Sequence, residues 1–478
     1  MSEQTRPGAP LPLEPDAAGA DALLHAAGGL VQDLLAEHRE GAVLGRPLGH
    51  DLAAQLLALR PGAEGRPLQE VLDLLRAVLA TGTDNAAAGE LAYIPGSGLL
   101  TAAVADLLAG TANRYTGLSA FSPAAVALEQ SVLSWLTERF DLPPSAQALL
   151  LSGGSAANLT ALIVAREARA AGQLARACLY VGEHAHASVR KAARLAGFDP
   201  ELVRVCPTVD GLHLDAEAVR IRIKQDLADG LLPVAVVGAA GTTNTGAVDD
   251  LAALAEVAAE HGCWFHVDAA YGGFFRLTAR GRARLEGIDR ADSITLDPHK
   301  SLFLPFGTGA LLVRDRHHLL TAFGEEADYL RDAVDDELAL PDLAGLGPEL
   351  TRPWRGLRLW LPLLLHGTDA FVAALDEVLD LAAWAAEELA ADPHVEVVSR
   401  PELSILTFRV PGDDAAQDAA LARIHADGRV RLSSTRLEGR VVLRLAVLSH
   451  RTTAATVTTA VTLIRRAAAE AARAAGTP

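Results

Sequence analysis

The middle of the 478-residue chain alternates short, mainly apolar runs with stretches whose apolar residues repeat at helical spacing. Seven such runs lie between about residues 145 and 315, and they are QALLLSGG, ACLYVGE, LVRVCPT, LPVAVVGAAGTT, CWFHVDAAYGG, SITLDPHK and GALLVRD. Strands without regular polar alternation are typical of a sheet that helices cover on both faces, and such sheets are mostly parallel. The pattern therefore predicts an α/β fold around a mostly parallel, seven-stranded sheet.

Helical patterns flank this region on both sides. Residues 21–80 and 98–140 carry apolar residues at helical spacing. After about residue 356, helical stretches at 357–390 and 452–474 enclose short apolar runs, which indicates a smaller α+β unit. The expected organisation is an N-terminal lead-in and helical arm over 1–85, a large domain over 86–355 and a small C-terminal domain over 356–478.

Charge and cysteine content narrow the range of partners. The formal net charge of −18 argues against nucleic acid or an anionic membrane as a partner. No apolar run approaches the length that spans a bilayer, and the N-terminus lacks the basic start and apolar stretch of a secretory signal. The three cysteines form no C-x-x-C pair, so neither a disulfide framework nor a zinc site is indicated. We expect a cytoplasmic protein without a metal.

Lysine is nearly absent, which singles out its few occurrences. Only three of the 42 basic residues are lysine, so the chain uses arginine wherever a plain positive charge is enough. Lys191 and Lys224 lie in polar, helix-like stretches and read as surface charges. Lys300 instead follows the buried run SITL, inside an α/β core. A primary amine at such a strand end suits covalent chemistry with a carbonyl group.

Three further motifs follow strands of the same sheet. Residues 152–155 (SGGS) join a strand to a helix, and glycines at a helix start can bind a phosphate. Asp268 follows the run CWFHV and could pair with a protonated ring nitrogen. His184 and His186 follow the run ACLYV. Taken singly, these motifs are more often an ordinary turn, a capping carboxylate and structural histidines. Together with Lys300 they match one ligand, pyridoxal phosphate (PLP), which presents a phosphate, a ring nitrogen, an aldehyde and an aromatic face.

These motifs resemble those of a known family. The segment HVDAAYGG followed by LDPHK, with 32 positions from Asp268 to Lys300, is similar to the group II PLP-dependent amino-acid decarboxylases. The resemblance covers about residues 85–450 and is greatest to the aromatic-L-amino-acid branch, through AYIP, SPAAVALEQSVLSWL and VLRLAVLS. It implies PLP-dependent transferase fold type I, decarboxylation of an L-amino acid to the amine and CO2, and a homodimer.

The resemblance also implies roles for individual residues. Lys300 is expected to hold PLP as a Schiff base, and Asp268 to pair with the pyridine nitrogen. Ala270 would pack on one face of the ring, while His186 would stack on the other face and help to orient the substrate carboxylate. The remaining positions matched to the phosphate and its surroundings are Gly154, Ser155, Thr243, Asp297 and His299.

Other matches concern the substrate. Tyr329, 29 residues after Lys300, stands where the aromatic branch carries a loop tyrosine that returns a proton to the substrate. The resemblance therefore implies that Tyr329 is catalytic, together with Lys300, His186 and Asp268. The residues expected to contact the substrate are Tyr93, Ile94, Pro95 and Arg444.

The chain departs from the family pattern in ways that bear on the substrate. Ser301 follows the lysine, where the family often has Trp or Tyr, and Ile94 and Gly117 stand where aromatic decarboxylases tend to carry Phe. The favoured substrate is an aromatic or other hydrophobic amino acid. One alternative is an aldehyde synthase, which decarboxylates and then oxidatively deaminates, although Tyr329 argues against it. The other alternative is a catalytically silent protein of the same fold.

Overall fold

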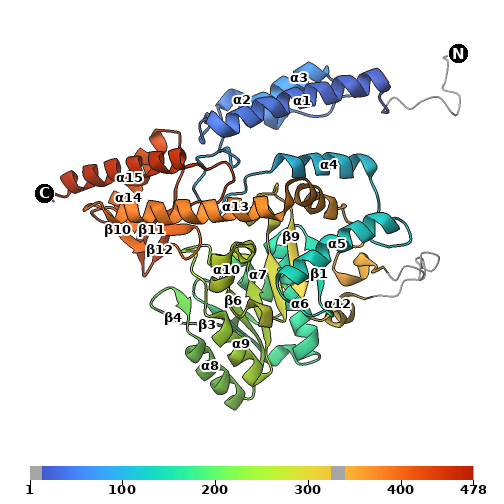
Figure 1. The fold of residues 1–478 in the computed structure, drawn as a ribbon, viewed down its shortest axis with the longest axis vertical. Coiled ribbons are helices and arrows are strands. Elements are labelled where there is room, and N and C mark those ends of the chain that lie inside the picture. Colours follow the sequence, from blue (N-terminus) through green and yellow to red (C-terminus); the bar gives the residue numbers. More distant parts are fainter. Residues whose placement is uncertain (1–12, 325–339, 477–478) are drawn as a thin grey trace.

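The computed structural model of the protein describes residues 13–324 and 340–476. The chain begins with three helices that lie along one edge of the molecule (Figure 1). These helices are α1 (Ala17–Glu40), α2 (His50–Ala58) and α3 (Leu68–Leu79). Two more, α4 (Leu100–Ala112) and α5 (Pro123–Arg139), lead toward the central sheet. Helix α5 begins at Pro123 because the fixed φ of proline suits the first helical position.

A seven-stranded sheet in the order β1-β9-β8-β7-β6-β2-β3 forms the centre of the molecule. The pairs from β3 across to β8 are parallel, whereas β9 runs antiparallel to both β8 and β1. The strands are β1 (Gln147–Leu151), β2 (Ala177–Gly182), β3 (Val203–Cys206), β6 (Leu232–Ala239), β7 (Trp264–Asp268), β8 (Ser293–Leu296) and β9 (Gly309–Val313). The predicted α/β fold with a mostly parallel sheet is confirmed.

Helices connect the strands and cover the sheet. They are α6 (Gly154–Ala170), α7 (Ala187–Leu195), α8 (Ala216–Ala228), α9 (Leu251–His261), α10 (Ala279–Arg284), α11 (Pro298–Ser301) and α12 (Arg316–Phe323). Helix α6 packs against α7 and against strands β6 to β9, while α8 and α9 pack together and contact β6. The chain crosses the sheet in opposite directions through these two pairs, so right-handed crossovers place the pairs on opposite faces.

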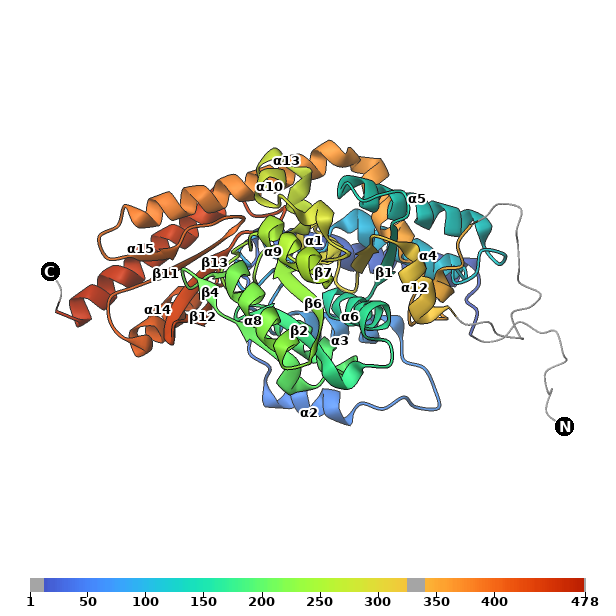
Figure 2. The same cartoon turned by 90° about the horizontal axis from the view of Figure 1, so that it is seen from below.

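The C-terminal region is built on a second, antiparallel sheet in the order β10-β11-β13-β12. The long helix α13 (Gly356–Ala390) leads into it and bends at Gly367, where φ is 72°. The strands and helices are β10 (Glu396–Ser399), β11 (Ile405–Arg409), α14 (Asp414–Ala426), β12 (Ser433–Leu437), β13 (Arg440–Ala446) and α15 (Ala454–Ala474). Figure 2 shows this region at the end of the molecule away from α4 and α12.

One continuous cluster of buried side chains runs through both sheets and the helices that pack on them. The domain boundaries at residues 85 and 355 remain a prediction. Among residues 13–324 and 340–476, no helix is both long and apolar enough to cross a membrane. The topology has one consequence for function, because β1, β2, β6, β7 and β8 all end at the same edge of the large sheet. In α/β sheets, ligands bind at that edge.

Candidate active site

A cavity of about 310 Å³ opens at this edge of the large sheet. It is lined by the loops and helix starts that follow five strands, so it collects residues from distant parts of the sequence. All nine residues predicted to surround the cofactor line it, namely Gly154, Ser155, His186, Thr243, Asp268, Ala270, Asp297, His299 and Lys300. The structure therefore brings together in one place the motifs that the sequence only placed at separate strand ends.

The amine of Lys300 enters the cavity from the short helix α11. Its Nζ lies 2.9 Å from Oδ2 of Asp297, and about a fifth of the lysine side chain is exposed. The other oxygen of Asp297, Oδ1, is buried and has no hydrogen-bond partner among the described residues. Next to it, His299 Nδ1 donates to the carbonyl oxygen of Thr308 (2.6 Å). Burial lowers the pKa of His299, so this ring is neutral at pH 7.

The start of α6 forms the opposite wall. A Cβ atom at Gly154 would lie 2.9 Å from Asp297 Oδ2 and 3.1 Å from the Ala270 methyl group. Any side chain there would enter the cavity, so glycine keeps this wall open. The first N–H groups of a helix have no partner within the helix, and the dipole places a partial positive charge there. This end of the cavity suits a phosphate group.

Asp268 and His186 face the cavity from the ends of β7 and β2. Asp268 is 8% exposed and accepts hydrogen bonds from Asn158 Nδ2 (3.0 Å) and from the backbone N–H of Ala270 (3.2 Å). His186 precedes α7, and its Nδ1 accepts from the backbone N–H of Ser188 (3.2 Å). The buried carboxylate has no cation within the described chain, which is the arrangement expected beside a ligand that brings its own positive charge.

Sequence reasoning missed three polar residues behind this wall: Asn158, Ser188 and His266. Asn158 and Ser188 line the cavity, and His266 is fully buried beside them. A signal for two of them, Asn158 and His266, was available in the sequence. Asn158 follows Gly154 by one helical turn, and His266 shares a face of β7 with Asp268, two positions on.

The four residues predicted to contact the substrate do not line the cavity. Tyr93 is exposed and has a positive φ of 52°, Ile94 is half-buried and Pro95 is buried. Arg444 is buried and donates to the backbone oxygens of Tyr93 (3.3 Å) and Thr243. It therefore holds the Tyr93 backbone beside the turn that carries Thr243, and its contact with substrate stays a prediction. Tyr329 lies outside the described residues.

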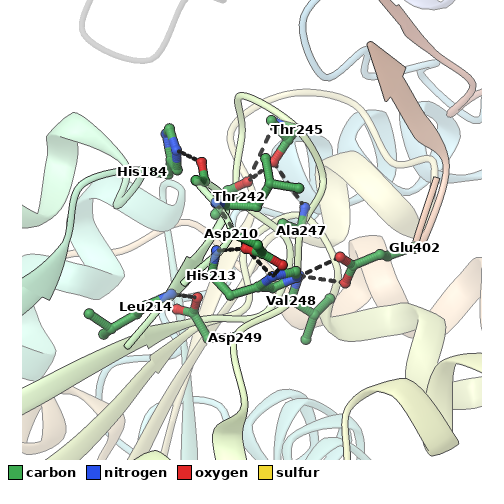
Figure 3. A network of polar contacts seen from close by, with 12 residues as sticks. His184, Asp210, His213, Leu214, Thr242, Thr245, Ala247, Val248, Asp249 and Glu402 are labelled. Atoms are coloured by element: carbon green, nitrogen blue, oxygen red, sulfur yellow. Dashed lines mark hydrogen bonds and ion pairs between the residues drawn. The ribbon is translucent and has the colours of Figure 1, made fainter. Parts of the chain in front are cut away.

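A polar network ties the turn after β6 to the C-terminal region (Figure 3). The hairpin of β4 (Thr208–Val209) and β5 (His213–Leu214) carries His213, whose Nε2 lies 2.6 Å from Oε1 of Glu402. The Glu402 hydrogen bond is the main cause that raises the pKa of His213 to about 9, and Asp210 contributes. Glu402 also accepts from the backbone N–H of Val248 (3.0 Å) and from Arg284. The network thus joins four segments: the β4–β5 hairpin, the turn after β6, α10 and the C-terminal region.

Comparison with known proteins decides the family. The model of the pyridoxal-dependent decarboxylase conserved domain matches residues 54–411, about three quarters of the chain. The chain belongs to the pyridoxal-dependent decarboxylase family. An aromatic-L-amino-acid decarboxylase of Bacillus atrophaeus is 36% identical over 76% of this chain and 77% of its own length. An L-2,4-diaminobutyrate decarboxylase of Rhizobium meliloti is 35% identical over 74% and 72%.

The fold agrees with solved structures of this family. The crystal structure of Oryza sativa TDC with PLP and tryptamine superposes with a TM-score of 0.91 at 29% identity, covering 96% of this chain and 99% of that chain. The amine of Lys300, the glycine wall at the start of α6 and the buried carboxylate of Asp268 all fit PLP. The protein is a PLP-dependent amino-acid decarboxylase.

Proposed function

We propose that the protein converts an L-amino acid with an aromatic or other hydrophobic side chain into the amine and CO2. The observation that carries this proposal is the cavity itself, in which an amine, a buried carboxylate and a helix start converge. The substrate class is supported by relatives that are named for aromatic substrates, from Bacillus atrophaeus and from rice. A diaminobutyrate decarboxylase is 35% identical to this chain, so a polar amino acid such as diaminobutyrate is the main alternative substrate.

The roles that we assign follow from what each side chain presents to the cavity. Lys300 would carry the cofactor through its Nζ, with Asp297 beside it as the counter-charge. Asp268 would hold a proton on the ring nitrogen, because a buried carboxylate stabilises a positive charge next to it. The start of α6, at Gly154 and Ser155, would bind the phosphate.

PLP, when bound, supplies an electron sink for the pair that is released when the bond between Cα and the carboxylate breaks. The surrounding residues decide which bond breaks, because they orient the substrate. His186 is exposed at the mouth of the cavity and would hold the substrate carboxylate. Thr243, Ala270 and His299 would complete the walls around the ring and the phosphate.

Amine and aldehyde products separate the proposal from its nearest competitor. A phenylacetaldehyde synthase of Arabidopsis thaliana is 30% identical over 80% of this chain, so the family contains both outcomes. Tyr329 favours the amine, because we assign it the return of a proton to Cα. With dioxygen as the oxidant, the Tyr329→Phe variant should therefore shift the product from amine toward aldehyde, with release of ammonia and hydrogen peroxide.

We further propose that the protein is a cytoplasmic homodimer. Helices α2 and α3 contain no buried residue, although their sequences are rich in leucine. Leu57 is 76% exposed on α2, and α4 exposes Leu107 and Leu108. A second copy would cover this apolar arm. All three cysteines are free, which suits a reducing compartment.

The test is a screen of the twenty amino acids, dihydroxyphenylalanine and 2,4-diaminobutyrate for CO2 release by the purified holoenzyme. Each product is identified as amine or aldehyde. We expect the fastest release from Trp, Tyr, Phe or dihydroxyphenylalanine, with the amine as product. Preferred turnover of diaminobutyrate or glutamate would refute the substrate class, and the absence of CO2 release would refute the activity.

A further inference from the structure

Behind the cavity, a chain of hydrogen bonds joins residues that face it. Asn158 on α6 donates from Nδ2 to Asp268 Oδ2 (3.0 Å) and to Ser188 Oγ (3.0 Å). Ser188 Oγ lies 2.7 Å from His186 Nδ1. On the other side, Asn158 Oδ1 lies 3.1 Å from Nε2 of His266. Asn158 is 1% exposed. This one buried amide therefore contacts Asp268 directly and reaches His186 through Ser188.

The far end of this chain fixes the direction of its bonds. Trp264 Nε1 can only donate, and it donates to Ser293 Oγ (2.8 Å). Burial lowers the pKa of His266 to about 4, so its ring is neutral at pH 7 and has one acceptor nitrogen. Because Asn158 Oδ1 can only accept, the proton of His266 sits on Nε2. Ser293 therefore donates its hydroxyl proton to His266 Nδ1 (2.8 Å).

The near end is fixed in the same way. A reversed Asn158 amide would aim its oxygen at the Asp268 carboxylate, so the orientation with Nδ2 toward Asp268 is the stable one. Ser188 Oγ receives an N–H from Asn158 and is left to donate its own proton to His186 Nδ1. The backbone N–H of Ser188 donates to the same nitrogen (3.2 Å). His186 therefore carries its proton on Nε2.

We propose that Asn158 is a positioning residue, whose amide fixes the Asp268 carboxylate directly and, through Ser188, fixes His186 as the Nε2-protonated tautomer. Asparagine is a poor residue for a helix interior, and a buried amide is costly unless both of its ends are paired. Here both ends are paired, and both donors lead toward the cavity. The inference rests on the proposed function, since it takes Asp268 and His186 to face the cofactor.

Asn158 Nδ2 has two arms, which are its hydrogen bond to Asp268 and its hydrogen bond to Ser188, which leads on to His186. Three variants separate these two arms. The Asn158→Ala variant removes both arms, whereas Ser188→Ala removes the hydroxyl arm to His186 and leaves the contact with Asp268. Thr160→Val is the matched control. Thr160 lies two positions further along α6, is also 1% exposed, and donates only to the carbonyl oxygen of Ala156 (2.9 Å). For each protein we would measure the dissociation constant of PLP from the apoprotein, the visible circular dichroism of the bound cofactor, and kcat.

The arms predict different results. Asn158→Ala should weaken PLP binding by about tenfold or more and reduce the visible dichroism, because a hydrogen bond to a buried charge is lost. Ser188→Ala should keep the PLP dissociation constant within about twofold of wild type while kcat falls by roughly tenfold. Thr160→Val should match the wild-type protein in all three measurements.

Wild-type PLP affinity and dichroism in Asn158→Ala would overturn the assignment, and so would equal losses in Thr160→Val. A loss of PLP binding in Ser188→Ala as large as that in Asn158→Ala would overturn the division into two arms. If Asn158→Ala does not fold, Asn158→Leu decides the question, because the leucine side chain is similar in size, adds no charge beside Asp268 and donates neither hydrogen bond. Failure of the wild-type protein to bind PLP would instead refute the proposed function, so the two failures are distinguishable.

Discussion

Replacing His213 with glutamine should lower the stability of the protein at neutral pH and leave it unchanged at high pH. His213 sits between Glu402 and Asp210 (Figure 3), and its pKa rises from 6.5 to about 9 in the folded chain. A folded pKa above the unfolded value means that the protonated ring stabilises the fold. That contribution is complete below pH 6.5 and disappears as the pH rises through 9.

The magnitude follows from the same shift. A rise of this size corresponds to about 3 kcal/mol in favour of the folded state. Solvent reaches 22% of the His213 side chain and the same share of Glu402, so screening reduces the figure. We expect about 2 kcal/mol at about pH 6 and less than about 0.5 kcal/mol at about pH 10.

Urea unfolding of the holoprotein, at one protein concentration and at both pH values, measures this contribution. The quantity of interest is the gap in unfolding free energy between wild type and His213→Gln. His317→Gln serves as the control, because His317 is exposed on α12 and its side chain makes no hydrogen bond within the described chain. A gap that is as large at high pH as at low pH, or is absent at low pH, would refute the reasoning.

Three further substitutions test other parts of the account. The Glu129 carboxylate is fully buried against Arg352, at 2.5 Å, and Arg352→Met leaves it without its cation. This variant should lower the free energy of unfolding in urea by about 3–5 kcal/mol. An unchanged unfolding midpoint would contradict this expectation. Gly154→Val places a side chain in the cavity and should weaken PLP binding at least about a hundredfold, measured on the apoprotein, whereas normal binding would show that the wall is elsewhere. Asp268→Asn removes a charge interaction of roughly 4 kcal/mol and should lower kcat by about a thousandfold; a variant that keeps most of its activity would remove Asp268 from the mechanism.

The central sheet was predictable because most of its strands are short, mainly apolar runs without regular polar alternation. Strand β6 is buried in all but its first residue, and its sequence LPVAVVGA shows this directly. By contrast, the polar run SSTRL gave no signal for β12, which forms a strand because it pairs with β13. The hairpin of β4 and β5 was also missed, since two-residue strands are shorter than any repeating pattern.

The cavity was predictable to the extent that each of its motifs is contiguous in sequence. Lys300, Asp268 and Gly154 each follow a strand, and strand ends meet at one edge of a parallel sheet. The links between motifs were not predictable. Asn158 reaches Asp268 across 110 positions of sequence, and Arg444 reaches Thr243 across 201. Such contacts depend on side-chain directions that only the folded structure defines.

The central claim is that Lys300 carries the cofactor, and the scarcity of lysine makes a direct test simple. The holoprotein is reduced with borohydride, which makes the bond between PLP and its lysine permanent, then digested and mapped by mass spectrometry. With only three lysines in the chain, each one can be read separately. We expect the pyridoxyl group on Lys300 alone. A label on Lys191 or Lys224, or none after reduction of the yellow holoprotein, would contradict the account.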